Sequence, residues 1–147
     1  PQADLDRPRA RPWEDNVRGI GAGGDRSYRH LTEVDGHDHV AYVACLDEDF
    51  EDAKRGAIVG VGRFIRDRKE RDVAEVAFVV HDRCQRRGVG RALRDRIRED
   101  ALARGIDFFR AHVLPSNFGI RRLLQTPSLI RINEREGAIH FWIARAA

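Results

Sequence analysis

The stretch that decides the fold is Val79-Val80-His81-Asp82-Arg83-Cys84-Gln85-Arg86-Arg87-Gly88-Val89-Gly90-Arg91-Ala92-Leu93. An apolar segment, residues 73–80, leads into a short polar loop, and Gly88 and Gly90 then open a helix. This order places free backbone N–H groups and the positive end of a helix dipole at one point, which suits a pyrophosphate. Neither glycine has a side chain that would hold phosphates away from the backbone. The stretch therefore predicts a strand, an anion-binding loop and a helix.

The loop resembles a known cofactor motif. Its spacing, Gln85-x-x-Gly88-x-Gly90, is neither the dinucleotide fingerprint nor a Walker A loop. It resembles the acetyl-CoA loop of the GNAT superfamily of N-acetyltransferases, whose signature is Gln/Arg-x-x-Gly-x-Gly/Ala between a strand and a helix. Residues 74–80 resemble the corresponding strand of bacterial protein-lysine acetyltransferases, and the segment 113–117 matches the family's strand end and its Asn. The resemblance covers about residues 27–147.

Size and composition exclude several other classes of protein. The 147 residues fit one domain, and 41% apolar with 35% charged residues indicates a globular chain. A net charge of +3, without interleaved aromatic residues, gives no reason to expect a nucleic-acid partner. No apolar run approaches the length of a membrane span. Cys45 and Cys84 are too few for a disulfide scaffold and lack metal-ligand spacing, so we expect no metal and a cytoplasmic location.

The chain divides into an irregular arm, residues 1–24, and an acetyltransferase domain, residues 25–147. We expect a helix end at 27–33, helices at 88–104 and 116–125, and strands at 40–46, 57–65, 73–80, 108–114, 129–132 and 138–144, with a turn at 134–137. This order predicts an α/β (α+β) fold with a mixed, mostly antiparallel sheet flanked by helices, as in the GNAT fold. The first strand of that fold is either hidden in the arm or missing. The chain contains no methionine, which fits a processed chain or a piece of a longer protein.

Local signals set the expected burial and the helix ends. Strand 73–80 is apolar except at one position, so we expect it to be buried on both faces. In helix 88–104 a core-facing stripe recurs every four residues, at Val89, Leu93, Ile97 and Ala101. Gly105 is expected to end that helix and Ser116 to cap the next one, which Pro127 stops.

The resemblance implies acetyl-CoA as acyl donor. The pantetheine arm would pair with the backbone of Phe78, Val79 and Val80. Gln85 begins the motif, and the diphosphate would lie on the N–H groups of Arg86, Arg87, Gly88, Val89, Gly90 and Arg91. Arg87, Arg91, Arg94 and Arg98 share one helix face; the first two are expected near the phosphates and the last two in solvent. The alternative is an ordinary strand-to-helix turn whose glycines allow tight packing.

Glu75 is the candidate general base, because an attacking ammonium must first lose a proton. It is the only charged residue of its strand, and we expect it to be buried among Val73, Ala77 and Val79. The resemblance also puts a catalytic Glu at this position. The alternative is a structural ion pair, with Arg66 lying diagonally across the hairpin.

Four residues in or near the expected site remain to be considered. Leu124 stands where many family members have a Tyr that protonates the leaving thiolate. Asn117 would bond the pantetheine or cap a helix, and the Val80 N–H or its neighbour would stabilise the oxyanion. Cys84 is taken as a substitution without function.

The sequence thus predicts an N-acetyltransferase that moves acetyl from acetyl-CoA to a primary amine, either a protein lysine or a small molecule. Many family members are dimers, so a homodimer is compatible with this prediction. The alternatives are a non-catalytic acyl-CoA-binding regulatory module and a catalytic domain from a longer regulated enzyme.

Overall fold

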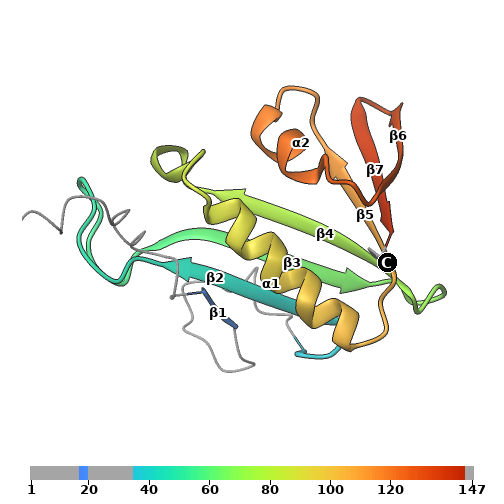
Figure 1. Cartoon of the computed structure of the whole chain (residues 1–147), viewed down its shortest axis with the longest axis horizontal. Helices are drawn as coiled ribbons and strands as arrows, with labels where there is room; N and C mark the ends of the chain where they lie inside the picture. The colour runs from blue at the N-terminus through green and yellow to red at the C-terminus, as the bar shows by residue number, and fades with distance from the viewer. Residues whose placement is uncertain (1–16, 20–34, 145–147) are drawn as a thin grey trace, which may run out of the picture.

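The computed structural model describes residues 17–19 and 35–144. Within them, seven strands form one sheet and two α-helices lie beside it (Figure 1). The strands are β1 (Val17–Gly19), β2 (His39–Cys45), β3 (Ile58–Arg66), β4 (Val73–Val80), β5 (Phe108–Val113), β6 (Leu129–Arg135) and β7 (Ala138–Ala144). The helices are α1 (Val89–Ala103) and α2 (Phe118–Leu124), and a short 3-10 turn, η2 (Asp82–Cys84), precedes α1.

The sheet is mixed and mostly antiparallel, as the sequence predicts. Its strand order is β1-β2-β3-β4-β5-β7-β6. Only the central pair, β4 and β5, runs parallel, because α1 carries the chain back to the starting edge of β4 before β5 begins. Helix α1 lies across β2, β3 and β4, and α2 contacts α1 (Figure 1).

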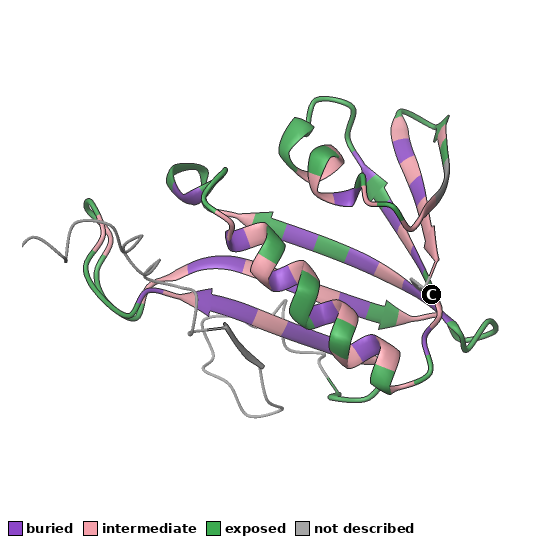
Figure 2. Cartoon of the chain, in the orientation of Figure 1, coloured by how far each residue is buried: buried purple, intermediate pink, exposed green. Residues whose placement is uncertain are grey.

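Helix α1 confirms the expected core stripe. Val89, Leu93, Ile97 and Ala101 are all buried against the sheet, whereas the opposite face of the helix is exposed (Figure 2). The helix ends as expected at Gly105, which has a φ of +79°. The Gly105 N–H donates to the Leu102 carbonyl and the next N–H donates to the Ala101 carbonyl, both at 3.1 Å. These two bonds satisfy carbonyls that the end of a helix otherwise leaves without donors.

Two glycines on β3 let α1 approach the sheet closely. A Cβ at Gly60 would lie 2.7 Å from Val89 Cγ1 and 2.9 Å from Leu93 Cδ1, and one at Gly62 would lie 3.0 Å from the Phe78 ring. A side chain at Gly60 would therefore press on α1, and one at Gly62 would press on the Phe78 ring of β4. The packing of α1 depends on these glycines, which the sequence did not single out.

The expectation that β4 is buried on both faces is wrong. Val76 and Phe78 are buried on the α1 face, but Ala77 and Val79 on the other face are exposed, and Val79 keeps 69% of its surface accessible. A continuous apolar run does not distinguish a strand covered on both faces from one whose second face remains open. Here that second face is open around the middle and the end of β4.

The first strand is present inside the expected arm. Residues Val17–Gly19 form β1, which pairs antiparallel with β2. The arm is therefore not irregular at these three residues. Residues 1–16, 20–24 and the expected helix end at 27–33 lie outside the described residues, and the boundary at residue 25 stays a prediction.

Two local expectations near the C-terminus are also wrong. Helix α2 is capped by Asn117 instead of Ser116, since the Asn117 Oδ1 accepts the Ile120 N–H at 3.2 Å. The final turn is shorter than residues 134–137, because β6 continues to Arg135. Only Glu136 and Gly137 form the turn, both with positive φ, as two-residue hairpins require.

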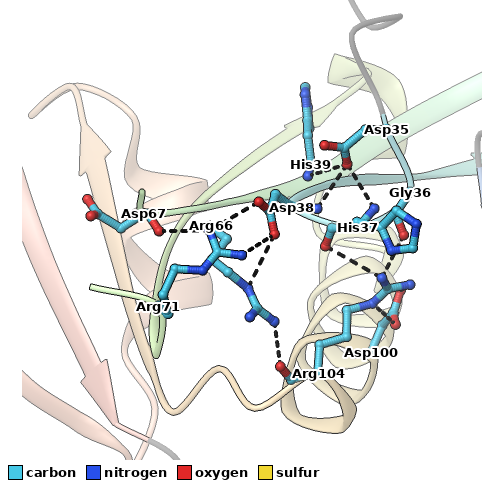
Figure 3. A network of polar contacts seen from close by, with 10 residues as sticks. All are labelled: Asp35, Gly36, His37, Asp38, His39, Arg66, Asp67, Arg71, Asp100 and Arg104. Atoms are coloured by element: carbon cyan, nitrogen blue, oxygen red, sulfur yellow. Dashed lines mark hydrogen bonds and ion pairs between the residues drawn. The ribbon is translucent and has the colours of Figure 1, made fainter. Parts of the chain in front are cut away.

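At the end of the sheet where α1 stops, polar side chains bind the elements together (Figure 3). We call this the polar end, made of Asp35, Asp38, Arg66, Asp67, Arg71, Asp100 and Arg104. Asp38 accepts from Arg71 at 2.7 Å, and Arg104 donates to Asp100 at 2.7 Å and to the Gly36 carbonyl at 2.6 Å. Arg66 donates to the Arg104 carbonyl. These bonds join β2, β3 and the last turn of α1.

Two backbone turns at the polar end are organised by carboxylates. Asp35 accepts the N–H groups of three residues, 37, 38 and 39, at 2.8–2.9 Å, which lowers its pKa. Asp67 accepts the N–H groups of Glu70 and Lys69 and also a bond from Arg110, and together these lower its pKa to about 2. Both carboxylates are therefore ionised at neutral pH.

Candidate active site

The parallel strands β4 and β5 separate part of the way along their length. Their pairing runs from Val73 and Phe108 to Glu75 and Arg110 and ends there. Beyond that point β5 turns away with β7 and β6, and a wedge opens between the two halves of the sheet (Figure 1). The second half of β4 is therefore an edge within the sheet, with no strand of the described residues on that side.

Backbone groups of alternate residues point into this wedge. The His81 N–H bonds the Val59 carbonyl on β3 at 2.8 Å, and hydrogen-bonded pairs alternate along antiparallel strands. The register pairs Val79 with Val61, so the backbone groups of Val79 are directed at β3. Those of Phe78 and Val80 face the wedge. The sequence predicted that the backbone of all three residues pairs with a cofactor. In the structure the backbone groups of Phe78 and Val80 are directed at the wedge and those of Val79 are not. The exposed side chain of Val79 lies on the face of the sheet opposite α1.

A cavity of about 440 Å³ lies along the α1 side of the wedge. Its floor is apolar, with Val76 and Phe78 from β4, Phe109 from β5 and Ile97 from α1. The segment after α2, Leu124–Ser128, forms part of the rim. The cavity thus follows the unpaired edge of β4 from the wedge toward the start of α1.

Three arginines of α1, Arg91, Arg94 and Arg98, line the cavity, and no acidic residue lines it. Arg94 donates to the Leu123 carbonyl at 3.0 Å and joins α1 to α2, so the expectation that it is merely solvated is wrong. Arg98, expected in solvent, lies on the cavity wall. Neither Arg91 nor Arg98 has an ion-pair partner in the described part of the chain. The cavity is therefore a cationic site suited to an anion.

The first turn of α1 supplies unused N–H groups next to this cavity. The first bond of the helix runs from the Ala92 N–H to the Gly88 carbonyl at 3.0 Å. The N–H groups of Val89, Gly90 and Arg91 come before it, and the capping residue Gly88 gives no side-chain acceptor. Gly88 has a φ of 90°, in the left-handed region that disfavours a Cβ. A helix start of this kind, next to cations, can hold a phosphate group.

The remaining loop residues have structural contacts as well. The Gln85 Nε2 donates to the Val80 carbonyl at 3.2 Å, which holds the loop against the end of β4. Arg86 is exposed with a φ of 60°. A Cβ at Gly90 would meet Leu123 Cδ2 at 3.3 Å, so tight packing explains this glycine directly. The packing alternative thus accounts for Gly90, while Gly88 is explained by its backbone conformation.

Arg87 points away from the cavity in this structure. Its guanidinium lies over the Phe50 ring, 4.8 Å from the centroid, and 3.9 Å from Glu51. Arg83 pairs with Asp52 at 2.7 Å and with Glu51 at 3.5 Å. The acidic loop between β2 and β3 therefore holds two arginines of the segment between β4 and α1. Contact between Arg87 and a phosphate requires that Arg87 leave Glu51.

Glu75 lies on the face of the sheet opposite α1, at the point where the wedge begins. Its side chain is 44% exposed, so the expected burial is wrong. Its ion-pair partner is Arg110, with Nε 4.0 Å from Glu75 Oε2. Arg66 is not the partner, because it pairs in register with Ala74 and its side chain bonds the end of α1. The sequence missed Arg110, since the register of a parallel pair cannot be read from a single chain.

Asn117, Leu124 and Cys84 are the remaining residues that the sequence singled out near the site. The capping bond of Asn117 is formed, and a contact with pantetheine stays a prediction. Leu124, in the position where a Tyr was considered, is 1% exposed and packs in the core. Cys84 is 2% exposed, and burial raises the pKa of its thiol. This inert thiol fits the interpretation of Cys84 as a residue without chemistry.

Two features are absent from the described residues. No group of three or more His, Cys, Asp or Glu side chains is arranged to hold a metal ion. No helix there has the length and apolar character needed to cross a bilayer.

Known proteins share this architecture. Residues 7–126 match the Acetyltransferase (GNAT) family. Acetyltransferase Pat of Mycolicibacterium smegmatis is 30% identical over 110 residues, covering 75% of this chain and 31% of Pat. The GNAT domain of S. lividans PAT superposes with a TM-score of 0.67 at 26% identity, covering 83% of this chain and 69% of that domain.

A cAMP-binding acyltransferase from Mycobacterium smegmatis superposes with a TM-score of 0.66 at 28% identity, covering 81% of this chain and 35% of that one. The chain thus spans about a third of the length of Pat and of this acyltransferase. Since the family match extends over most of the sequence and agrees with the fold, the chain belongs to the GNAT acetyltransferase family, a family of acyltransferases.

Proposed function

We propose that the chain transfers the acetyl group of acetyl-CoA to a primary amine by direct attack. The observation that carries this proposal is the unpaired edge of β4 beside a cavity lined by Arg91, Arg94 and Arg98. The pantetheine arm would add to the backbone of Phe78 and Val80 as an extra strand. The diphosphate would lie on the N–H groups from Arg86 to Arg91, at the start of α1.

Glu75 would act as the general base. It lies where β4 and β5 part, so the wedge gives an acyl group held along β4 a route toward it. A carboxylate within reach of the amine, directly or through one water molecule, can take the proton of the attacking ammonium. The Val80 N–H faces the wedge and would stabilise the oxyanion of the tetrahedral intermediate. With no Tyr near the cavity in the described residues, the thiolate would leave unassisted or take its proton from water.

The acceptor would be a lysine side chain of a protein in preference to a small amine. On the face of the sheet that carries Glu75, Ile65 is paired with it in register and is 43% exposed, and Val79, four residues further along β4, is 69% exposed. Small-molecule sites are usually concave and enclose most of the ligand. An open apolar surface instead fits a side chain presented by another protein, with its methylene groups on Ile65 or Val79.

The cytoplasm would be the site of action. Cys45 and Cys84 are the two cysteines of the chain, and they are not joined by a disulfide. This arrangement fits a reducing compartment.

The test is calorimetric titration with acetyl-CoA, followed by a free-thiol assay with lysine peptides and small amines. We expect acetyl-CoA binding and release of thiol with lysine peptides. Glu75→Gln should lower turnover roughly 100-fold or more and leave acetyl-CoA affinity unchanged. Glu99→Gln, an exposed carboxylate on α1, is the matched control and should behave like the wild type.

Other outcomes contradict particular parts of the proposal. Wild-type turnover in the Glu75→Gln variant would remove Glu75 from the mechanism. Binding without thiol release for any amine would favour a non-catalytic acyl-CoA-binding module. Absence of binding would mean that the loop from Gln85 to Gly90 is a structural turn.

A further inference from the structure

Arg110 is the residue in register with Glu75 on the neighbouring strand. The two form the last pair of the β4–β5 ladder before the strands separate. Residues paired in register on adjacent strands point to the same face of the sheet and lie about 4.8 Å apart. Arg110 is therefore the neighbour of Glu75 at the apex of the wedge, on the face opposite α1.

The guanidinium of Arg110 also binds a second carboxylate, that of Asp67. Its Nη2 donates to Asp67 Oδ2 at 2.7 Å, and both side chains are largely shielded, with 27% and 20% exposed. Asp67 is itself fixed by two backbone N–H groups, from Lys69 and Glu70. The carboxylate of Asp67 thus anchors Arg110 to the turn between β3 and β4.

One donor of this anchored guanidinium is unused. The Nε atom of Arg110 is buried and has no hydrogen-bond partner, although leaving a buried N–H without an acceptor is unfavourable. The nearest carboxylate oxygen is Oε2 of Glu75, 4.0 Å away. Glu75 is partly exposed, so a rotation of its side chain can bring that oxygen within hydrogen-bond distance.

We infer that Arg110 is a positioning residue for Glu75, donating its Nε–H to one carboxylate oxygen and directing the other oxygen toward the acceptor amine. The inference rests on the proposed role of Glu75 as the base. The chain Asp67, Arg110, Glu75 resembles other catalytic relays in which an outer carboxylate orients an inner group. Arg110 does not contact the acyl group. It fixes the angle from which Glu75 takes the proton.

The experiment measures kcat, the KM for a lysine peptide and the Kd for acetyl-CoA in Arg110→Gln, Glu75→Gln and the double variant. We expect Arg110→Gln to lower kcat roughly 10- to 100-fold, because a misplaced catalytic group loses this much. The Kd for acetyl-CoA should stay unchanged. In the Glu75→Gln background the Arg110 substitution should have no further effect on kcat, since the residue acts through Glu75.

Two further variants keep the test decisive. Arg110→Lys keeps a cation that can reach Asp67 and loses the Nε–H, so kcat should fall while the thermal midpoint is retained; it replaces Arg110→Gln where the latter fails to fold. Arg96→Gln removes an exposed arginine from α1, where it lies 3.8 Å from Glu99 and contacts neither Asp67 nor Glu75. This control should keep the wild-type kcat.

The outcomes separate this inference from the proposed function. If Glu75→Gln is impaired while Arg110→Gln and Arg110→Lys keep wild-type kcat, the positioning role is overturned and the base remains. A loss from Arg110→Gln that persists undiminished in the Glu75→Gln background also overturns it, because Arg110 then acts on something else. If Glu75→Gln itself keeps wild-type turnover, both the role of Glu75 as base and the role of Arg110 in positioning it are wrong.

Discussion

The two ends of β4 differ in how their polar groups are used. At the polar end, Asp38, Asp67 and Arg104 each hold two or more partners across different elements (Figure 3). At the other end, which we call the open end, the N–H groups of Phe78 and Val80 face the wedge without a strand partner, and Arg91 and Arg98 lack ion-pair partners among the described residues. Along the eight residues of β4, the polar groups nearby therefore change from ones that mostly have partners to ones that mostly do not.

Because of this difference, residues near one end of β4 contribute mainly to stability, and residues near the other end are available for binding. A matched polar network fixes neighbouring elements, and its loss leaves buried or half-buried groups without partners. Unmatched donors add nothing to the stability of the free protein, but they are available to a ligand. We therefore expect substitutions at the polar end to change the free energy of unfolding and substitutions at the open end to change acetyl-CoA affinity.

The largest expected effect is at the open end. The double variant Arg91→Gln/Arg98→Gln removes two cations from the cavity wall, and acetyl-CoA affinity should fall about 100-fold, or about 2.7 kcal/mol, because charge-assisted contacts with phosphates are lost. The thermal midpoint should not change. Calorimetry measures the affinity, and Arg96→Gln is the control, because Arg96 lies over the Tyr42 ring on another side of α1. Equal affinities in all three proteins would mean that the cavity does not hold the cofactor.

At the polar end, Arg104→Gln should lower the free energy of unfolding by about 1–3 kcal/mol, since it removes bonds to Asp100 and to the Gly36 carbonyl. The affinity for acetyl-CoA should stay at the wild-type value. Urea unfolding and calorimetry on the same sample check both parts. If Arg104→Gln lowered acetyl-CoA affinity as much as the cavity variant does, the two ends of β4 would not have separate roles in stability and binding.

Gly88 is expected to be the exception at the open end. Gly88→Ala places a Cβ at a φ of 90° and should cost about 1–2 kcal/mol of stability. Gly119→Ala in α2 is the matched control, because a Cβ there meets only Gln85 Oε1 at 3.9 Å, so stability should be unchanged or slightly higher. Urea unfolding compares the two; an equally stable Gly88→Ala would contradict the strain argument.

The smallest expected effect concerns acid stability. The pKa of Asp67 lies at about 2 in the folded chain, against an ordinary value of 3.8, because backbone N–H groups and Arg110 stabilise its charged form. This contribution to stability is present above pH 3.8 and is lost as the pH falls toward 2. Asp67→Asn should therefore lose less stability across that window than the wild type. Thermal melts at several pH values measure this loss, with Asp52→Asn as the control. If the thermal midpoint of Asp67→Asn fell with pH as steeply as that of the wild type, the prediction would be refuted.

The sequence predicted the elements whose signals are local. The stripe from Val89 to Ala101, the strand 73–80 and the end of α1 at Gly105 depend on periodicity and on one backbone conformation, and the structure confirms them. The loop between β4 and α1 also followed from its own spacing, while its binding of an anion stays a prediction. Each of these features can be recognised within about fifteen consecutive residues.

What the sequence missed depends on residues distant in the chain. Arg110 reaches Glu75 only because the parallel register pairs them, whereas the hairpin suggested Arg66. The close approach of Gly60 to Val89 depends on where α1 crosses the sheet. The exposure of Val79 depends on which faces of β4 are covered. None of these relations leaves a periodic signal, so the partners and the burial of the site residues required the structure.

The alternation along β4 has a consequence for hydrogen exchange. The amide of Val79 is protected by β3, while its neighbours Phe78 and Val80 face the wedge without a strand partner. The free protein should therefore show slow and fast exchange at successive residues of one strand. A bound pantetheine arm that pairs with this edge would slow the two fast amides and leave Val79 unchanged. Two amide protons in the middle of the fold thus report occupancy of the wedge without any substitution in the chain.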